Sequence, residues 1–135
     1  MNKSKEEIAR NYHKEGCNCA QAVLLAFAED FDLSLEDAAK IALPFGGGMA
    51  RGETCGALTG ALMVLGLTES GSVPPTPEDK VKNREKTKKL AETFEEKYKT
   101  TLCREILATP EGKGKALCND LVGYMASQLE NLLNK

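Results

Sequence analysis

The chain has 135 residues, and its 18 lysines and arginines against 20 aspartates and glutamates give a formal net charge of -2. Such a balance supplies no global field for nucleic acid or an anionic membrane. The absence of Trp, with three Tyr and four Phe, also argues against a base-stacking surface. We expect a single domain over residues 1–135, long enough to bury one core, that binds no nucleic acid.

Two features of the sequence bear on where the protein works. The first residues hold no apolar segment of signal-peptide type, and no apolar stretch approaches the roughly 18 residues of a membrane-spanning helix. We therefore expect a cytoplasmic protein with no membrane insertion. The chain also contains five cysteines. An odd count fits a disulfide framework poorly, and cytosolic thiols stay reduced unless they bind metal or cycle catalytically.

The N-terminal part of the chain has the pattern of two helices. Residues 4–7 have the sequence of a capping box that opens the first helix, and Gly16 interrupts that helix. Apolar side chains then recur between Cys19 and Phe27 with the spacing of one helix face. This spacing places Cys19 at the N-terminal end of a buried stripe, with Cys17 in the turn before it.

A glycine-rich segment follows the third predicted helix. That helix begins at the cap Ser34 and stops near Pro44. The three glycines at 46–48 then allow a left-handed backbone or a close approach to another group. A fourth helix, from about Thr54 to Leu67, is apolar nearly all round. We expect it to be the central and most buried helix.

Small residues recur along this fourth helix. Gly52, Gly56 and Gly60 are spaced four apart and would line one helix face. A face of glycines lets a second helix axis approach closely. The helix is too short to span a membrane, so the pattern predicts tight packing within a soluble protein.

The rest of the chain is also helical in pattern. A proline-rich linker at 68–77 leads into a long surface helix that ends near Lys99. A short helix around 102–108 carries Cys103, and a last helix at about 115–133 places Cys118 on its apolar stripe. No strand pattern of useful length occurs. The predicted fold class is therefore all-α, a compact single-domain bundle of about five to six helices around the central glycine/alanine-rich helix.

Cys55 is the candidate nucleophile. If Glu53 or Thr54 caps the fourth helix, Cys55 lies in its first turn, where free N–H groups and the positive end of the helix dipole stabilise a thiolate. We expect this position to lower the pKa of the thiol. Arg51 could add to the effect, and Gly56 leaves the sulfur open to approach.

Other sites are less well supported by the spacing of the residues. The glycine-rich segment has neither the P-loop nor the dinucleotide pattern, and no strand precedes it, so phosphate binding is not favoured.

The cysteines include no C-x-x-C, and Cys103 and Cys118 stand 15 residues apart on different elements. Only tertiary folding could join them with Cys19 and Cys55 in one site.

The single histidine limits cysteine–histidine chemistry. A nucleophile pair of that kind would have to use His13, the only histidine of the chain. His13 is followed by Lys14 and Glu15 on the first predicted helix. We therefore expect its side chain to be exposed, which does not favour a Cys–His pair.

The chain resembles the C_GCAxxG_C_C family of small redox-active proteins. Residues 55–60, Cys-Gly-Ala-Leu-Thr-Gly, match the core of the family pattern, with Gly-Gly-Gly-Met at 46–49 before them. Residues 18–23 are similar to the family's first cysteine segment, and Cys103 and Cys118 to its last two cysteines. The resemblance covers nearly the whole chain, in order.

The resemblance implies a redox class and a common role for four thiols. The cysteines that would act as one group are Cys19, Cys55, Cys103 and Cys118. Cys17 lies outside the four-cysteine pattern. It could be a resolving thiol, an extra ligand or an incidental residue.

Three functions follow from these observations. The first is thiol/disulfide exchange or electron transfer with a redox partner protein or small thiol, in which Cys55 attacks and Cys19, Cys103 or Cys118 resolves. The second is a metal-binding module in which the same four cysteines hold zinc or an iron–sulfur cluster. The third is a non-catalytic helical interaction domain whose cysteines pack. A homodimer is compatible with each.

Overall fold

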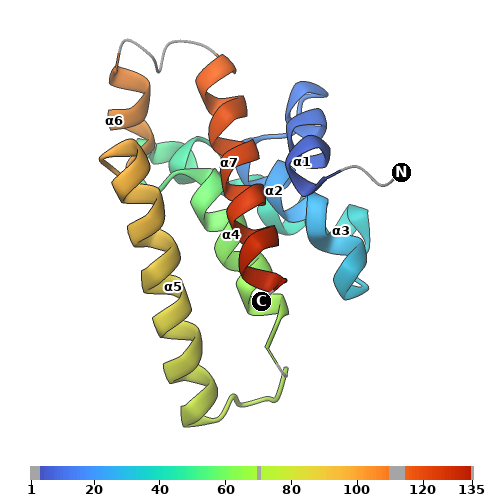
Figure 1. Ribbon diagram of the computed structural model, residues 1–135. Coiled ribbons are helices and arrows are strands. Elements are labelled where there is room, and N and C mark those ends of the chain that lie inside the picture. The colour runs from blue at the N-terminus through green and yellow to red at the C-terminus, as the bar shows by residue number, and fades with distance from the viewer. Residues whose placement is uncertain (1–3, 70, 110–114, 135) are drawn as a thin grey trace.

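The computed structural model describes residues 4–69, 71–109 and 115–134, and this part of the chain is all-α, as predicted. It contains seven α-helices rather than five to six (Figure 1), because each segment with a helical pattern, the short ones included, forms a helix of its own. They are α1 (Lys5–Lys14), α2 (Cys19–Ala28), α3 (Leu35–Ala42), α4 (Gly56–Leu67), α5 (Pro77–Tyr98), α6 (Cys103–Ala108) and α7 (Lys115–Leu133). None of the described helices is both long and apolar enough to cross a membrane.

Local capping signals explain where several helices begin. The hydroxyl oxygens of Ser4, Ser34 and Thr76 accept hydrogen bonds from backbone N–H groups three residues ahead, at 3.1–3.2 Å. These caps satisfy N–H groups that the first turn leaves unpaired. The start of α2 has a capping box that sequence reasoning missed: Asn18 accepts from the N–H of Gln21, and Gln21 accepts from the N–H of Asn18.

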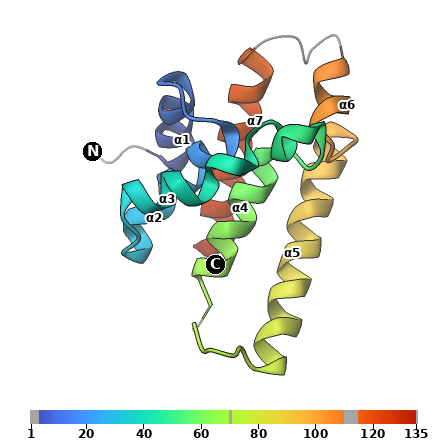
Figure 2. The same cartoon turned by 180° about the vertical axis from the view of Figure 1, so that it is seen from behind.

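The most buried helix is α2, so the expectation that the fourth helix is the most buried one was wrong. Eight of the ten residues of α2 are buried, against seven of twelve in α4. The reason is that α2 packs against α1, α3, α4 and α7, so neighbours cover nearly its whole circumference. Figure 2 shows α5 on the opposite side of the molecule from α1 and α3. The largest side chains of the core include Phe27, Leu65 and Phe94.

The predicted close helix contact forms between α4 and α2. A Cβ atom on Gly60 would lie 2.7 Å from the carbonyl oxygen of Ala20, and one on Gly56 would lie 2.9 Å from the Ala20 nitrogen. Both distances are shorter than real contacts allow, so glycine at these positions permits the approach. Gly52 does not share the helix face: it lies in the loop with φ 68° and faces Arg104.

A short backbone pairing holds the start of α4 against the segment before α6. Thr54 and Leu102 form an isolated antiparallel bridge, in which the Cys55 N–H donates to the carbonyl oxygen of Thr101 at 2.8 Å. The N–H of Cys103 donates to the carbonyl oxygen of Glu53 at 2.6 Å. This extended stretch delays α4 to Gly56, so Cys55 is the residue that precedes the helix and not a member of its first turn.

Candidate functional site

Four of the cysteines lie at the N-terminal end of a helix. Cys19 and Cys103 are the first residues of α2 and α6, Cys55 immediately precedes α4, and Cys118 is the fourth residue of α7. The first turn of a long helix presents unpaired N–H groups and the positive end of the dipole, which favour a negative charge. All five cysteines of the chain are free thiols in this structure.

Cys118 is the thiol whose pKa is lowered. Its hydrogen bond with Cys19 lowers the pKa of Cys118 to about 7, and this effect exceeds the opposing effect of burial. The pKa of Cys19 is raised well above its ordinary range, first by the hydrogen bond with Cys118 and then by burial. The negative charges that Cys55, Cys118 and Cys103 would carry raise it further. The interaction between these two thiols therefore favours the protonated form of Cys19 and the thiolate of Cys118.

Cys55 has a raised pKa, so the expectation of an acidic thiol at this position was wrong. Its side chain is only 3% exposed. Burial raises the pKa of Cys55 to about 11, although hydrogen bonds with the backbone of Ala57 and Leu58 at the helix start act to lower it. The charges of Cys103 and Cys118 act in the same direction as burial. The helix start contributes as expected, but the loss of hydration outweighs it.

The bridge before α4 places Cys55 and Cys103 on a common face. Cys55 stands opposite Thr101 in the antiparallel pairing, and Cys103 lies two residues beyond Thr101. Side chains alternate between faces along extended backbone, so residues in this diagonal relation project to the same side. Cys103 is partly buried, and its pKa is raised by burial and then by the charge of Cys118.

Cys17 stands apart from the other cysteines. It is partly buried, and its backbone N–H donates to the carbonyl oxygen of Tyr12 at 3.1 Å. Burial raises the pKa of the Cys17 thiol, and the charge of Glu15 raises it further. The surroundings of this thiol thus come from the end of α1 and the turn after it.

His13 is a member of the site that the sequence reasoning placed in solvent. The expectation of an exposed side chain was wrong: His13 is partly buried, and its Nε2 atom lies 3.9 Å from the sulfur of Cys19. Its Nδ1 atom lies 3.2 Å from the Nδ2 atom of Asn119. The contact between His13 and Cys19 could not be read from the sequence, because it depends on a turn at Gly16. The φ of 116° at this glycine reverses the chain so that α1 lies beside α2.

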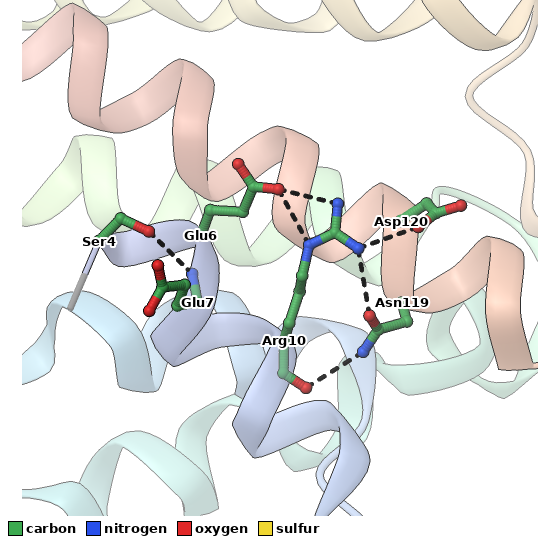
Figure 3. Close-up of polar contacts among 6 residues, drawn as sticks. All are labelled: Ser4, Glu6, Glu7, Arg10, Asn119 and Asp120. Carbon is green, nitrogen blue, oxygen red and sulfur yellow. Dashed lines mark hydrogen bonds and ion pairs between the residues drawn. The ribbon is translucent and has the colours of Figure 1, made fainter.

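Arg10 connects α1 to Asn119 and Asp120 near the start of α7 (Figure 3). One of its terminal nitrogens donates to Asn119 Oδ1 at 3.3 Å and pairs with Asp120 at 2.9 Å. Its Nε atom donates to Glu6 at 3.0 Å, while Asn119 Nδ2 donates to the carbonyl oxygen of Arg10 at 3.1 Å. Gly123 makes room for the guanidinium, since a Cβ atom there would overlap it. This network fixes the start of α7 against α1.

The ligand set expected for a metal is not assembled in the described part of the chain. Within residues 4–69, 71–109 and 115–134, no group of three or more His, Cys, Asp or Glu side chains is placed to hold one metal ion. The cysteines expected to hold a metal in the metal-binding alternative are Cys19, Cys55, Cys103 and Cys118.

The fold and the thiols define the class: an all-α protein with free cysteines at helix starts, two of which shift each other's pKa in opposite directions. The amino-acid sequence narrows this class to one protein family. The family described as "Putative redox-active protein (C_GCAxxG_C_C)" matches residues 17–132, and the chain belongs to this family. No curated protein and no solved structure gave a match. The family supplies a redox class and names no substrate.

Proposed function

We propose that the protein is a thiol–disulfide redox protein in which Cys118 is the attacking thiolate and Cys19 is the resolving thiol. What supports the proposal is the mutual influence of these two thiols on their acidity: interaction with Cys19 lowers the pKa of Cys118 to about 7, and interaction with Cys118 raises the pKa of Cys19. A thiol with a pKa near neutral pH combines a large thiolate fraction with good nucleophilicity. The proposal transfers the role of nucleophile from Cys55, which is buried and has its pKa raised to about 11.

The reaction moves two electrons from the pair of thiols to a disulfide of the partner. The Cys118 thiolate attacks one partner sulfur, forms a mixed disulfide and expels the other partner sulfur as a thiolate. Cys19 then loses its proton to solvent and attacks Cys118, which forms the Cys19–Cys118 disulfide and expels the second partner thiolate. Both partner thiolates take up protons, so a disulfide and two thiols become a disulfide and two thiols. The disulfide requires the two sulfurs to approach to about 2 Å.

Cys55 and Cys103 support the pair in this proposal. When ionised, either of them raises the pKa of Cys19. The charge of Cys118 likewise raises the pKa of Cys55 and of Cys103. Thiols that influence one another in this way lose their protons in separate steps, because each new negative charge makes the next ionisation harder. Keeping Cys55 and Cys103 protonated at neutral pH therefore leaves the negative charge on Cys118.

Disulfide mapping after mild oxidation tests the proposal. The full chain is oxidised with a small disulfide such as oxidised glutathione, remaining thiols are alkylated, and the cross-linked peptides are identified by mass spectrometry. We expect a Cys19–Cys118 link in the wild type, and a trapped glutathione adduct on Cys118 in Cys19→Ser. Cys17→Ser is the matched control and should form the same link. Five thiols that stay free, or a link through Cys55 with Cys19 and Cys118 free, would contradict the proposal.

A further inference from the structure

A chain of hydrogen bonds from Arg10 fixes the orientation of the Asn119 amide. A guanidinium carries only donors, so the group that faces Arg10 Nη1 at 3.3 Å must be the amide oxygen. A backbone carbonyl only accepts, so the group that faces the Arg10 carbonyl at 3.1 Å must be the amide nitrogen. The two contacts agree on one orientation, and they leave the second hydrogen of Nδ2 for another acceptor.

That second hydrogen determines which nitrogen of His13 is protonated. Asn119 Nδ2 lies 3.2 Å from His13 Nδ1. Because Nδ2 is a donor, Nδ1 must be the unprotonated nitrogen that accepts. A neutral imidazole carries one ring proton, which then lies on Nε2, and Nε2 is 3.9 Å from the sulfur of Cys19.

The direction of the hydrogen bond between His13 and Cys19 distinguishes this pair from a cysteine nucleophile that is activated by a histidine base. A base must present an unprotonated nitrogen to the sulfur. Here the unprotonated nitrogen faces Asn119, and the N–H faces Cys19.

We propose that His13 is a hydrogen-bond donor to Cys19 and stabilises the negative charge on this sulfur when it is the leaving group of the Cys19–Cys118 disulfide. Asn119 and Arg10 are positioning residues that hold the ring in the required tautomer. The inference rests on the proposed function for its chemistry. The tautomer itself rests only on the contacts of His13 and Asn119.

The step concerns the opening of the disulfide by a small thiol reductant. The thiolate of the reductant attacks the Cys118 sulfur, a new S–S bond forms there, and the Cys19–Cys118 bond breaks. The electron pair of the broken bond leaves on Cys19, where it accepts the hydrogen bond from His13 Nε2–H. Cys19 then takes a proton from solvent, and the second thiol of a dithiol reductant releases Cys118. The proton of His13 stays on the ring throughout.

Nitrogen NMR of the imidazole tests the tautomer without any redox step. His13 is the only histidine, so its two ring nitrogens give unambiguous signals in the reduced wild-type protein. We expect Nε2 to be protonated and Nδ1 unprotonated. In Asn119→Asp, whose carboxylate accepts and retains the contact with Arg10, the proton should move to Nδ1. Protonation of Nδ1 in the wild type, or an equal mixture of tautomers, would overturn the inference even if the disulfide forms.

The rate of disulfide opening tests the role of the donor. We expect His13→Phe, which keeps a ring without an N–H group, to slow the reduction of the Cys19–Cys118 disulfide by dithiothreitol roughly tenfold. His13→Gln, which can present an amide N–H to the sulfur, should recover most of the rate. Circular dichroism of both variants confirms that they are folded. Equal rates in His13→Phe and the wild type would overturn the role, whereas failure of the disulfide to form in the wild type would instead contradict the proposed function.

Discussion

The starts of α4 and α7 both carry a cysteine, and the two thiols have opposite acidities. The pKa of Cys55, which precedes α4, is raised to about 11, whereas the pKa of Cys118 in the first turns of α7 is lowered to about 7. Both positions lie near free N–H groups of a helix start. A helix start therefore does not by itself make an acidic thiol: depth of burial and a polar partner decide whether the pKa rises or falls.

The burial of Cys55 follows from how α4 is held. Its N–H is paired with Thr101, and the next residue, Gly56, packs directly on Cys19 and Ala20 of α2. Only 3% of Cys55 is left exposed. Cys118 is only partly buried, and its interaction with Cys19 lowers its pKa. The difference in reactivity between Cys55 and Cys118 should therefore shrink when α4 is loosened, and also when Cys19 is removed.

The largest expected effect comes from forcing α4 away from α2. In Gly60→Ala, the new Cβ would meet the backbone of Ala20 at 2.7 Å, so we expect a loss of about 1–3 kcal/mol in the free energy of unfolding and faster alkylation of Cys55. Gly66→Ala is the matched control in the same helix, because nothing lies within 4 Å of its Cβ position. It should be stabilising by up to about 1 kcal/mol.

Urea denaturation with alkylation of the native state measures both quantities. If the two alanine variants change the free energy of unfolding equally, the close contact between α4 and α2 does not hold Cys55 in place.

A smaller effect is expected from removing the partner of Cys118. In Cys19→Ala the pKa of Cys118 should rise from about 7 toward the ordinary value of a thiol, because the hydrogen bond that lowers it is gone. The thiolate fraction at pH 7 falls by a larger factor than the reaction rate, since a more basic thiolate is also more nucleophilic. We therefore expect iodoacetamide to alkylate Cys118 roughly sixfold more slowly at pH 7 in Cys19→Ala than in the wild type.

Cys55→Ala is the control for this experiment. Cys55 is protonated at pH 7 because its pKa is raised to about 11, so its removal takes no charge from the site. We expect the alkylation rate of Cys118 to change by less than about twofold in this variant. Equal slowing in Cys19→Ala and Cys55→Ala would mean that the hydrogen bond is not the cause of the low pKa.

The sequence was sufficient for features whose cause lies within one or two helical turns. The caps at Ser4, Ser34 and Thr76 are local, and so is the small face of Gly56 and Gly60 that permits close helix packing. All-α character follows from the same local periodicity. These signals depend on residues three or four apart, which a single sequence displays directly.

The acidity of the thiols could not be predicted, because it depends on contacts between distant segments. The pKa of Cys118 at the start of α7 is lowered by Cys19 at the start of α2, and the bridge that makes Cys55 precede its helix joins Thr54 to Leu102. His13 reaches Cys19 only after the turn at Gly16 reverses the chain. Each contact requires the packed core, which spacing along the chain does not reveal.

Site-resolved alkylation as a function of pH is the most direct test of the central claim. The wild-type protein is treated briefly with iodoacetamide between pH 5 and pH 11, and the modified fraction of each cysteine is read by peptide mass spectrometry. A lowered pKa gives a thiolate at lower pH, so the rate for Cys118 should reach half of its maximum at about pH 7, while Cys55 stays unmodified until the pH approaches about 11. A profile in which Cys55 reacts at the lower pH, or in which both thiols titrate together, would contradict the account.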